Sequence, residues 1–258
     1  MENNIEKNVK NPRLESLARA VITYPEQLPV SARISEIKEL WKKHQLIIVC
    51  GATGSGKTTQ LPKAALELGC TSVGCTQPRR IAATAMARRL AAELQIPFGE
   101  GVGCKMRFQE NTYPATFLKF MTDGILLAES RSDRLLKKYD ALIIDEAHER
   151  SLNIDFILGM LKLLCSKRPD LKIAISSATL DAGAFSAFFD DAPVIDIEGR
   201  TFPIDDVYLP PEDDEELPEL VARGVETYLR QHLRGDALVF LPGEREIRDT
   251  ADMLNGRN

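Results

Sequence analysis

Short apolar runs alternate along this chain with longer stretches in which apolar residues recur every three or four positions. The short runs predict buried strands, and the longer stretches predict amphipathic helices. We expect strands over residues 46–50, 72–76, 104–108, 117–121, 141–145, 172–176 and 194–197. We expect helices over residues 32–44, 57–68, 80–94, 124–130, 152–166 and 182–189. Strands and helices in alternation indicate an α/β fold with a mostly parallel, doubly wound sheet.

Two polar segments flank this alternating region, which we interpret as the main domain over residues 31–200. Residues 1–30 are polar and contain prolines, so we expect an N-terminal extension with little core of its own. Residues 201–216 also contain prolines and end in the acidic run 212–216. This composition is typical of a linker, with the charge run exposed as a solvated loop.

A second α/β unit is expected to begin after the linker, over residues 217–258. The pattern there predicts a helix over 217–232, a strand over 237–241 and a helix over 243–255. We interpret this segment as the incomplete start of a second domain. Its single strand would begin a sheet whose neighbours are missing, so we expect its edges and its apolar face to be poorly covered.

Composition narrows the class of protein. The chain has 258 residues and a net charge of −5, so a nucleic-acid partner would need a local basic surface rather than bulk charge. No apolar run approaches the roughly 18 residues of a membrane span, and the N-terminus lacks the apolar segment of a secretory signal. The 5 cysteines are scattered without a metal-binding pattern. We therefore expect reduced thiols in a cytoplasmic protein.

A glycine-rich loop follows the first predicted strand and matches the phosphate-binding pattern G-x-x-x-x-G-K-[ST]. The loop comprises Gly51, Ala52, Thr53, Gly54, Ser55, Gly56, Lys57, Thr58 and Thr59. Its glycines let backbone amides and the following helix N-terminus approach an anion. Lys57 would reach the β- and γ-phosphates of a nucleotide, and the Thr58 hydroxyl would bind Mg²⁺. A strand before the loop and a helix after it argue against a chance match.

Acidic residues follow the predicted strand at 141–145, at the sheet edge where α/β proteins bind ligands. Asp145 is the natural carboxylate for Mg²⁺, through bound water. Glu146 is placed to orient and deprotonate an attacking water. His148 by itself is more often a packed or hydrogen-bonded histidine than a catalytic one. The alternative interpretation of the whole segment is a solvated acidic turn.

The segment Asp145-Glu146-Ala147-His148-Glu149-Arg150 resembles motif II of the DEAH-box helicases. Other motifs of that family have counterparts here in the same order. They are Thr76-Gln77-Pro78-Arg79-Arg80 for motif Ia, Thr122-Asp123-Gly124 for motif Ib, Ser177-Ala178-Thr179 for motif III and residues 235–246 for motif IV. The residues at 22–25 and 28–30 are most similar to the bacterial HrpA-type branch. The resemblance runs from about residue 20 to the end of the chain.

This resemblance implies a RecA-like P-loop domain in an ATP-dependent RNA helicase, an ATP hydrolase with ATP and Mg²⁺ as cofactors. Helicases of this family continue into a second RecA-like domain, which carries motifs V and VI and the arginines that touch the γ-phosphate, and into further C-terminal domains. The present sequence ends at Asn258, shortly after the counterpart of motif IV. We therefore expect residues 1–258 to bind nucleotide, hydrolyse ATP negligibly and unwind nothing.

Candidate nucleic-acid contacts lie just after predicted strands. Arg79 and Arg80 could clamp a phosphate, and Thr122 could offer its hydroxyl to another. Arg107, beside Phe108, could hook the backbone. Taken alone, basic residues of this kind favour solvated surface charges. The resemblance implies instead that Arg79, Arg80, Thr122 and Arg107 contact single-stranded RNA or DNA.

Three further residues take their roles from the resemblance. Arg89 matches the arginine that stacks on adenine in the family. Ser177 and Thr179 would couple motif II to the nucleic-acid side, with His148 as a hydrogen-bonding intermediary. The alternative interpretation is that Ser177 and Thr179, which follow a strand, are turn or helix-capping residues.

Two other functions stay open at this point. A secretion or pilus ATPase can carry a nearly identical P-loop, although the DEAH-like and motif III-like segments argue against it. The chain could also be a nucleotide-dependent RNA-binding module without catalysis. For either function we expect the protein to be a monomer. RNA and DNA are not distinguished, because backbone contacts do not report on the 2′-hydroxyl.

Overall fold

The structure of this protein, a computed structural model, describes residues 11–178, 182–199, 205–231 and 236–256. The chain divides into two compact units, which are residues Met1–Thr201 (unit 1) and Phe202–Asn258 (unit 2). Unit 1 contains the sheet and every candidate site residue of the sequence analysis.

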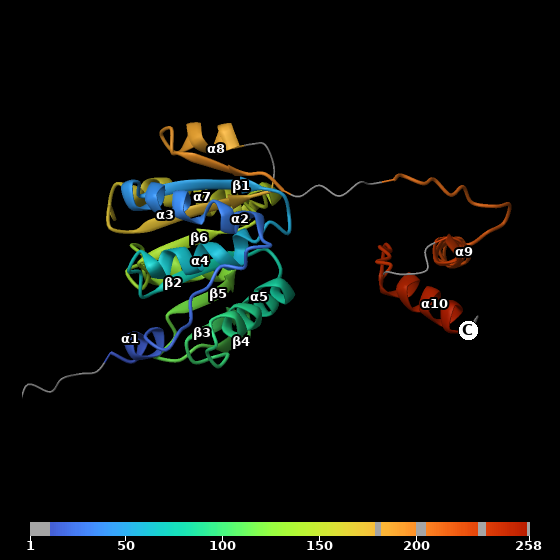
Figure 1. Ribbon diagram of the computed structural model, residues 1–258, viewed down its shortest axis with the longest axis horizontal. Helices are drawn as coiled ribbons and strands as arrows, with labels where there is room; N and C mark the ends of the chain where they lie inside the picture. The colour runs from blue at the N-terminus through green and yellow to red at the C-terminus, as the bar shows by residue number, and fades with distance from the viewer. Residues whose placement is uncertain (1–10, 179–181, 200–204, 232–235, 257–258) are drawn as a thin grey trace, which may run out of the picture. The chain divides into compact units, whose positions relative to one another are not determined.

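Unit 1 is built on one sheet (Figure 1). Its strands are β1 Leu46–Gly51, β2 Val73–Gln77, β3 Val102–Met106, β4 Gln109–Asn111, β5 Leu118–Thr122, β6 Ala141–Ile144, β7 Lys172–Ser177 and β8 Val194–Ile197. They lie in the order β4-β3-β5-β2-β6-β7-β1-β8. Every neighbouring pair is parallel except β3 and β4, which form an antiparallel hairpin. The expected α/β fold with a mostly parallel, doubly wound sheet is confirmed.

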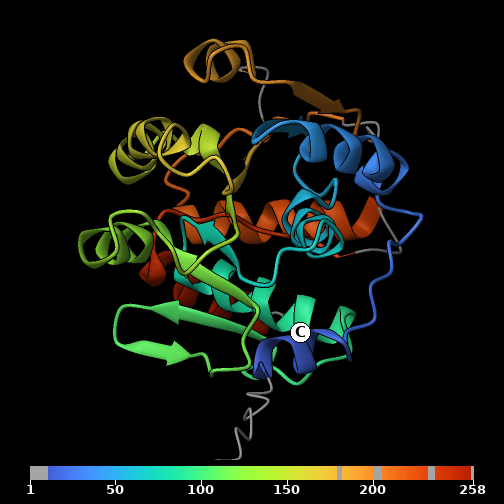
Figure 2. The ribbon, with the colours of Figure 1, turned by 90° about the vertical axis from the view of Figure 1, so that its left-hand side faces the viewer.

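Helices cover both faces of this sheet (Figure 2). One face carries α2 Pro29–Ala32, α3 Ile34–Lys43, α4 Lys57–Glu67 and α5 Arg80–Glu93. The other face carries α6 Asp123–Ser132, α7 Leu152–Cys165 and α8 Ala182–Phe188. Alternate residues of β1 point to the two layers: Ile47 and Val49 join the first core cluster, and Ile48 and Cys50 the second. The layers leave the carboxyl ends of the strands open, where α/β proteins place their sites.

The N-terminal segment differs from the expected extension. Its described part contains helix α1 Pro12–Leu17, whose N-cap Asn11 accepts a hydrogen bond from the Arg13 amide at 3.1 Å. Val30 is fully buried in the first core cluster, so this segment contributes to the core of unit 1. A helix of 6 residues is too short to reveal its period in the sequence.

Two element boundaries also differ from expectation. The strand expected at 104–108 lies at Val102–Met106 and turns at Phe108, with φ 68°, into the unexpected strand β4. Strand β4 has a polar sequence, Gln-Glu-Asn, so it shows no apolar run. The helix expected at 32–44 lies at Ile34–Lys43, and the short helix α2 Pro29–Ala32 before it was not expected.

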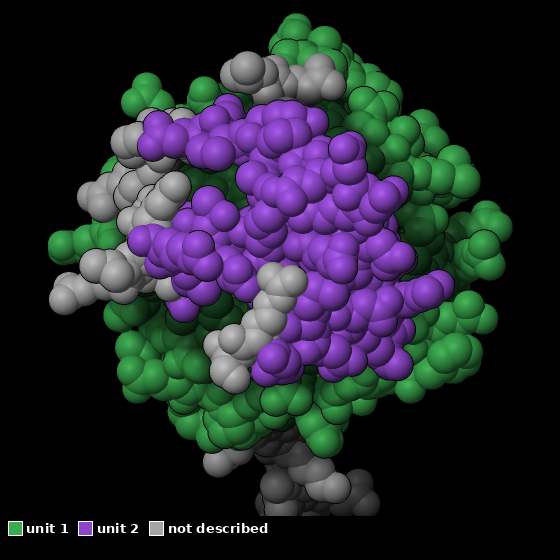
Figure 3. Space-filling model, turned by 90° about the vertical axis from the view of Figure 1, so that its right-hand side faces the viewer, with its two compact units in different colours: residues 1–201 green, residues 202–258 purple. Residues whose placement is uncertain are grey.

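The described part of unit 2, the purple unit in Figure 3, contains helices α9 Leu217–Gln231 and α10 Glu244–Asn255. The two helices pack against each other. The strand expected at 237–241 is wrong: this segment is not a strand, and Leu238 and Phe240 are exposed. An extended segment becomes a strand only when it pairs with another. The acidic run at 212–216 lies outside the helices and is exposed at every residue except Glu215, which accepts hydrogen bonds from Arg223 at 2.6 and 2.7 Å. This contact lowers the pKa of Glu215 to about 2.

Two negative expectations of the sequence analysis concern these elements. No helix within the described ranges is long and apolar enough to cross a membrane. All of Cys50, Cys70, Cys75, Cys104 and Cys165 are free thiols, and only Cys165 is partly exposed.

Candidate nucleotide and nucleic-acid site

The glycine-rich loop connects β1 to α4 and is held from outside by residues of the N-terminal segment. Gly56 has φ 95°, which favours glycine, and a Cβ there would lie 2.9 Å from Leu28 Cδ1 and 3.0 Å from Val30 Cγ1. The Val30 amide donates to the Ser55 carbonyl oxygen at 3.0 Å. Leu28 and Val30 therefore brace the loop, a role that the sequence analysis missed. Whether Leu28 and Val30 reach the loop depends on the path of the N-terminal segment in space. Such a contact produces no periodic pattern of apolar residues in the sequence.

Lys57 begins α4, and its ammonium group turns back into the loop. Its Nζ donates to the carbonyl oxygens of Gly51 at 2.5 Å and Ala52 at 3.0 Å, and to Ser55 Oγ at 3.1 Å. Burial lowers the pKa of Lys57, and the charges of Asp145 and Glu146 oppose that shift. A desolvated cation held only by neutral oxygens is well placed to exchange them for the oxygens of a phosphate.

Thr58, in the first turn of α4, meets Asp145, which directly follows β6. Thr58 Oγ1 donates to Asp145 Oδ2 at 2.5 Å across 87 residues of sequence. The same oxygen accepts a hydrogen bond from Gln77 Nε2 at 2.5 Å, a contact that the sequence analysis did not foresee. Gln77 ends β2, the neighbour of β6, so its position at the same sheet edge was the available signal.

The donor set around Asp145 fits an octahedral cation that keeps several waters. Asp145 Oδ1 is buried and has no hydrogen-bond partner among the described residues. One hydroxyl, one carboxylate and otherwise water or phosphate oxygens are the ligands that Mg²⁺ usually takes in nucleotide sites. The described residues hold no group of three or more His, Cys, Asp or Glu side chains that would suit a metal bound by protein alone. Thr58 and Asp145 are therefore the residues that could hold Mg²⁺.

Glu146 occupies a strained backbone position at the start of the 3-10 turn Ala147–Glu149. Its φ of 52° lies in the left-handed region, which is uncommon for residues other than glycine. Such strain is often found at functional positions. Burial raises the pKa of Glu146, and the adjacent Asp145 carboxylate acts in the same direction. A higher pKa makes this carboxylate a better proton acceptor.

His148 joins the acidic turn to the end of β7. Its Nε2 lies 3.3 Å from Glu146 Oε2, and its Nδ1 accepts a hydrogen bond from the Ala178 amide at 3.0 Å. The Ala178 amide is thus one contact from this segment to His148, and the sequence analysis did not name it. Ser177 is buried at the end of β7, whereas Thr179 lies outside the described residues.

Among the remaining nucleotide candidates, Ala52 and Thr59 belong to the loop, whereas Arg89 lies on α5. A Cβ on Gly199 would lie 2.8 Å from Ala52 Cβ, so Ala52 faces the end of the β8 region. Thr59 Oγ1 accepts a hydrogen bond from Gln60 Nε2 at 2.7 Å. Arg89 Nε donates to Glu93 Oε1 at 3.0 Å on the outer side of α5. No described contact brings Arg89 to the loop itself.

The nucleic-acid candidates lie at three places. Arg79 is exposed, and its Nη2 lies 3.7 Å from Glu149 Oε1 of the acidic turn. Arg80 and Arg107 line one groove between α5 and the β3–β4 hairpin, together with Arg88, which gives this groove a basic lining. The Arg107 guanidinium lies 4.9 Å from the centre of the Phe108 ring. Thr122 ends β5 and precedes α6 without capping it through its side chain.

Asp123, the first residue of α6, provides a test of this electrostatic description. Burial raises its pKa from 3.8 to about 6, and the charges of Glu149 and Asp145 act in the same direction. The folded state therefore binds its proton more tightly than the unfolded state does. Stability should fall as pH rises between about 4 and 6, where only the unfolded state has lost the proton, and stay reduced above that range.

Asp123→Asn should remove this fall, because asparagine does not ionise. Relative to the original protein, its free energy of unfolding should rise between pH 4 and 6 by up to about 3 kcal/mol and then level off. Denaturant titrations followed by the fluorescence of Trp41, the single tryptophan, would report on unit 1 alone. A constant difference between the two proteins across this pH range would contradict the assignment.

Comparisons with known proteins agree with this arrangement. The family model described as DEAD/DEAH box helicase matches residues 32–186. The chain is 53% identical over 252 residues to "ATP-dependent RNA helicase HrpA" of Escherichia coli strain K12, covering 95% of this chain and 19% of that protein. It is 50% identical over 265 residues to "ATP-dependent RNA helicase HrpA homolog" of Haemophilus influenzae, covering 98% of this chain and 20% of that protein. The chain thus spans about a fifth of the length of these curated relatives.

A solved structure supports the fold directly. The "Crystal structure of Escherichia coli DEAH/RHA helicase HrpB" matches 90% of this chain and 30% of that chain with a TM-score of 0.83 and 36% sequence identity. Its similarity confirms the RecA-like architecture that the resemblance implied. Since the family model covers more than half of the sequence, the chain belongs to the DEAD/DEAH box helicase family.

Proposed function

We propose that this protein binds Mg-ATP at residues 51–59 and that Glu146 activates the water that attacks the γ-phosphate. The observation that carries this proposal is the contact between Thr58 and Asp145, with the second Asp145 oxygen buried and unpartnered among the described residues. Mg²⁺ held by these two residues would neutralise charge on the β- and γ-phosphates. Lys57 would add a second positive charge to the phosphate-binding loop.

The whole protein is proposed to be an ATP-dependent RNA helicase that moves on and unwinds RNA. Its support is the family membership together with the names of its relatives. In this proposal, residues 31–200 are the first RecA-like domain, 201–216 a linker, and 217–258 the start of a second RecA-like domain. Free cysteines throughout agree with a cytoplasmic location. We propose a monomer and leave RNA and DNA as alternative single-stranded partners.

The proposed coupling between hydrolysis and nucleic acid passes through His148. Its contacts with Glu146 and the Ala178 amide join the water-activating carboxylate to the loop after β7. The contact of Arg79 with Glu149 gives a second connection, from the phosphate-clamping residues to the same acidic turn. In this proposal, a change at the nucleotide moves the turn at 147–149. The turn then transmits the movement to the loop after β7 through His148 and to Arg79 through Glu149.

Replacing both Arg79 and Arg80 with alanine should weaken binding of single-stranded RNA of any sequence by a similar factor. Each lost phosphate contact should also flatten the slope of log affinity against log salt by roughly 0.7. Fluorescence anisotropy with two oligonucleotides of different sequence, over a salt series, would measure both effects. Arg131→Ala, at an exposed position in the last turn of α6, is the matched control. An effect on one sequence only, or an unchanged slope, would show that these arginines are not backbone clamps.

The enzymatic part of the proposal is tested by ATP turnover with and without single-stranded RNA. The polypeptide should carry residues 1–258 together with a complete second RecA-like domain, because an arginine from the partner domain is worth about 10³–10⁵ in rate in related enzymes. RNA-stimulated turnover is the expected result. Turnover that RNA leaves unchanged would favour an ATPase of another kind.

A further inference from the structure

Helix α7 is apolar on two opposite sides. One side is buried in the second core cluster through Ile154, Ile157, Leu158, Leu161 and Leu164. The other side carries Leu152, Phe156 and Leu163, residues that are 86%, 65% and 70% exposed. A helix with apolar residues on two opposite sides is normally covered on both of them. No part of unit 1 within the described residues covers this outward stripe of α7.

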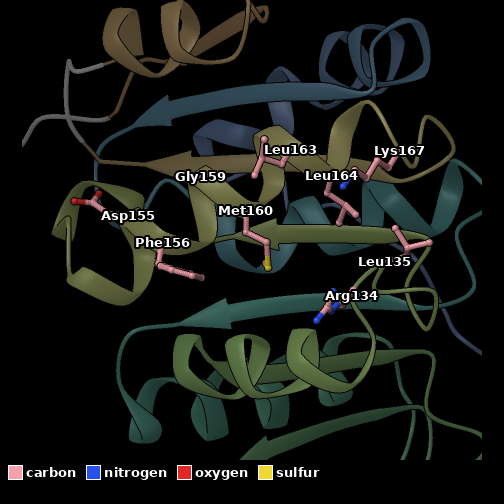
Figure 4. A pocket seen from close by; sticks show the side chains of 9 residues that line it. All are labelled: Arg134, Leu135, Asp155, Phe156, Gly159, Met160, Leu163, Leu164 and Lys167. Carbon is pink, nitrogen blue, oxygen red and sulfur yellow. The ribbon is translucent and has the colours of Figure 1, made fainter.

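This stripe forms one wall of a groove with a volume of about 740 Å³ (Figure 4). The opposite wall is the segment Arg134–Leu135, which precedes β6. In Figure 4 the side chains of Phe156 and Met160 project from α7 toward the side on which Arg134 lies. The groove lies on the outer surface of the helix layer, away from the loop at 51–59 and from the arginines of the nucleic-acid candidates. It is thus distinct from the proposed catalytic and RNA sites.

Gly159 lies in the middle of this stripe, between Phe156 and Leu163. A glycine inside a helix is less favourable for the helix than alanine. Unit 1 does not require it, because a Cβ at Gly159 would meet no other atom within 4 Å. Its φ is not in the left-handed region either. The missing side chain leaves a notch in the groove, through which the backbone of another helix could approach closely.

The charges around the groove are one-sided. Arg134 and Lys167 are both exposed and, among the described residues, neither forms an ion pair. The groove's one acidic residue, Asp155, is already paired with Arg150 at 2.6 Å. A second copy of α7 would bring only this paired carboxylate to the two cations. Carboxylates from a different chain would complement them.

We propose that this groove is a docking site for an amphipathic helix of a partner protein. The helix would place large apolar residues at i, i+4 and i+7 into the groove, with its backbone near Gly159. Acidic residues at one end of the helix would face Arg134 and Lys167. RNA is a poor fit, because the groove is lined mainly by aliphatic and aromatic side chains.

The test is a selection of displayed helical peptides on immobilised residues 1–258, followed by anisotropy measurements with the selected peptides. We expect enrichment of peptides with apolar residues at i, i+4 and i+7 and with Asp or Glu at one end. Gly159→Leu should weaken binding of these peptides at least tenfold. The thermal midpoint of the same variant should be unchanged or higher, because leucine favours a helix more than glycine does. Loss of binding without loss of stability separates docking from misfolding.

Two further variants sharpen the test. Gly183→Leu in α8 is the matched control, since a Cβ there also meets no atom within 4 Å, and it should leave peptide binding unchanged. Arg134→Glu combined with Lys167→Glu should weaken acidic peptides and favour basic ones instead. Selected peptides that bind Gly159→Leu as tightly as the original chain would overturn the proposal. Self-association that Gly159→Leu abolishes, or single-stranded RNA that displaces the peptides, would assign the groove to a second copy or to nucleic acid instead.

Discussion

Lys57→Ala is expected to weaken the binding of Mg-ADP and Mg-ATP to residues 1–258 by about 30-fold or more. Truncating one partner of a buried charged contact typically costs about 2–5 kcal/mol, and each 1.4 kcal/mol is a factor of about ten in affinity. The ammonium of Lys57 is buried within the loop and bonded only to neutral oxygens of the loop itself. Calorimetric titration with nucleotide in the presence of Mg²⁺ would measure the loss.

The fold should survive this substitution. Lys57 donates only to loop atoms in the structure, so its removal leaves the core clusters of unit 1 intact. Circular dichroism and the emission of the buried Trp41 should stay unchanged. Lys42→Ala, at an exposed position near the end of α3, is the control for the loss of one positive charge. Nucleotide affinity within twofold of the original protein would remove the phosphate-binding assignment of the loop.

Glu146→Gln is expected to separate binding from hydrolysis. Glutamine keeps the shape of the side chain but cannot accept a proton, and the loss of a general base typically lowers the rate by about 10²–10⁴. Nucleotide binding should persist, because Lys57, Thr58 and Asp145 are untouched. Turnover is measured in a polypeptide that joins residues 1–258 to a complete second RecA-like domain, and affinity is measured in the same protein.

The neighbouring glutamate is a suitable control for this variant. Glu149 belongs to the same turn but contacts Arg79 rather than the nucleotide loop. Glu149→Gln should therefore leave basal turnover, measured without RNA, within a few fold of the original. If Glu146→Gln hydrolysed ATP at the original rate, the water would be activated by another group. If it lost nucleotide binding as well, Glu146 would serve in the binding site rather than in proton transfer.

Helix α7 shows what a periodic pattern of apolar residues can predict and what it cannot. Apolar residues through 152–166 predicted the helix correctly, and the structure places it at Leu152–Cys165. The pattern did not say that Phe156 and Leu163 would face outward while Ile157 and Leu161 face the sheet. A helix that is apolar on both sides gives the same period whichever side is covered. Only the packing of α7 into the second core cluster decides which stripe is left exposed.

At 237–241 the sequence pattern predicted the wrong secondary structure. Its apolar run, Ala-Leu-Val-Phe-Leu, predicted a strand, yet the segment forms none, and Phe240 is 86% exposed. A strand depends on a neighbour that may lie anywhere in the chain, whereas a helix completes its hydrogen bonds locally. Helices α9 and α10, expected on either side of the segment, accordingly have the predicted bounds to within about one residue.

Local residue types by themselves determined the α/β alternation, the glycine-rich loop, the acidic turn and the family to which the chain belongs. These features depend on neighbours in sequence, on glycine conformations and on the side-chain chemistry of a few consecutive residues. Tertiary structure alone decided which of them meet. The strand order places β7 between β1 and β6, and this brings Thr58 to Asp145 and the Ala178 amide to His148. Contacts between distant segments also decide the strand order, the packing of Leu28 and Val30 against the loop, and which stripe of α7 is exposed. No short window of sequence contains both partners of such a contact, so local patterns cannot predict it.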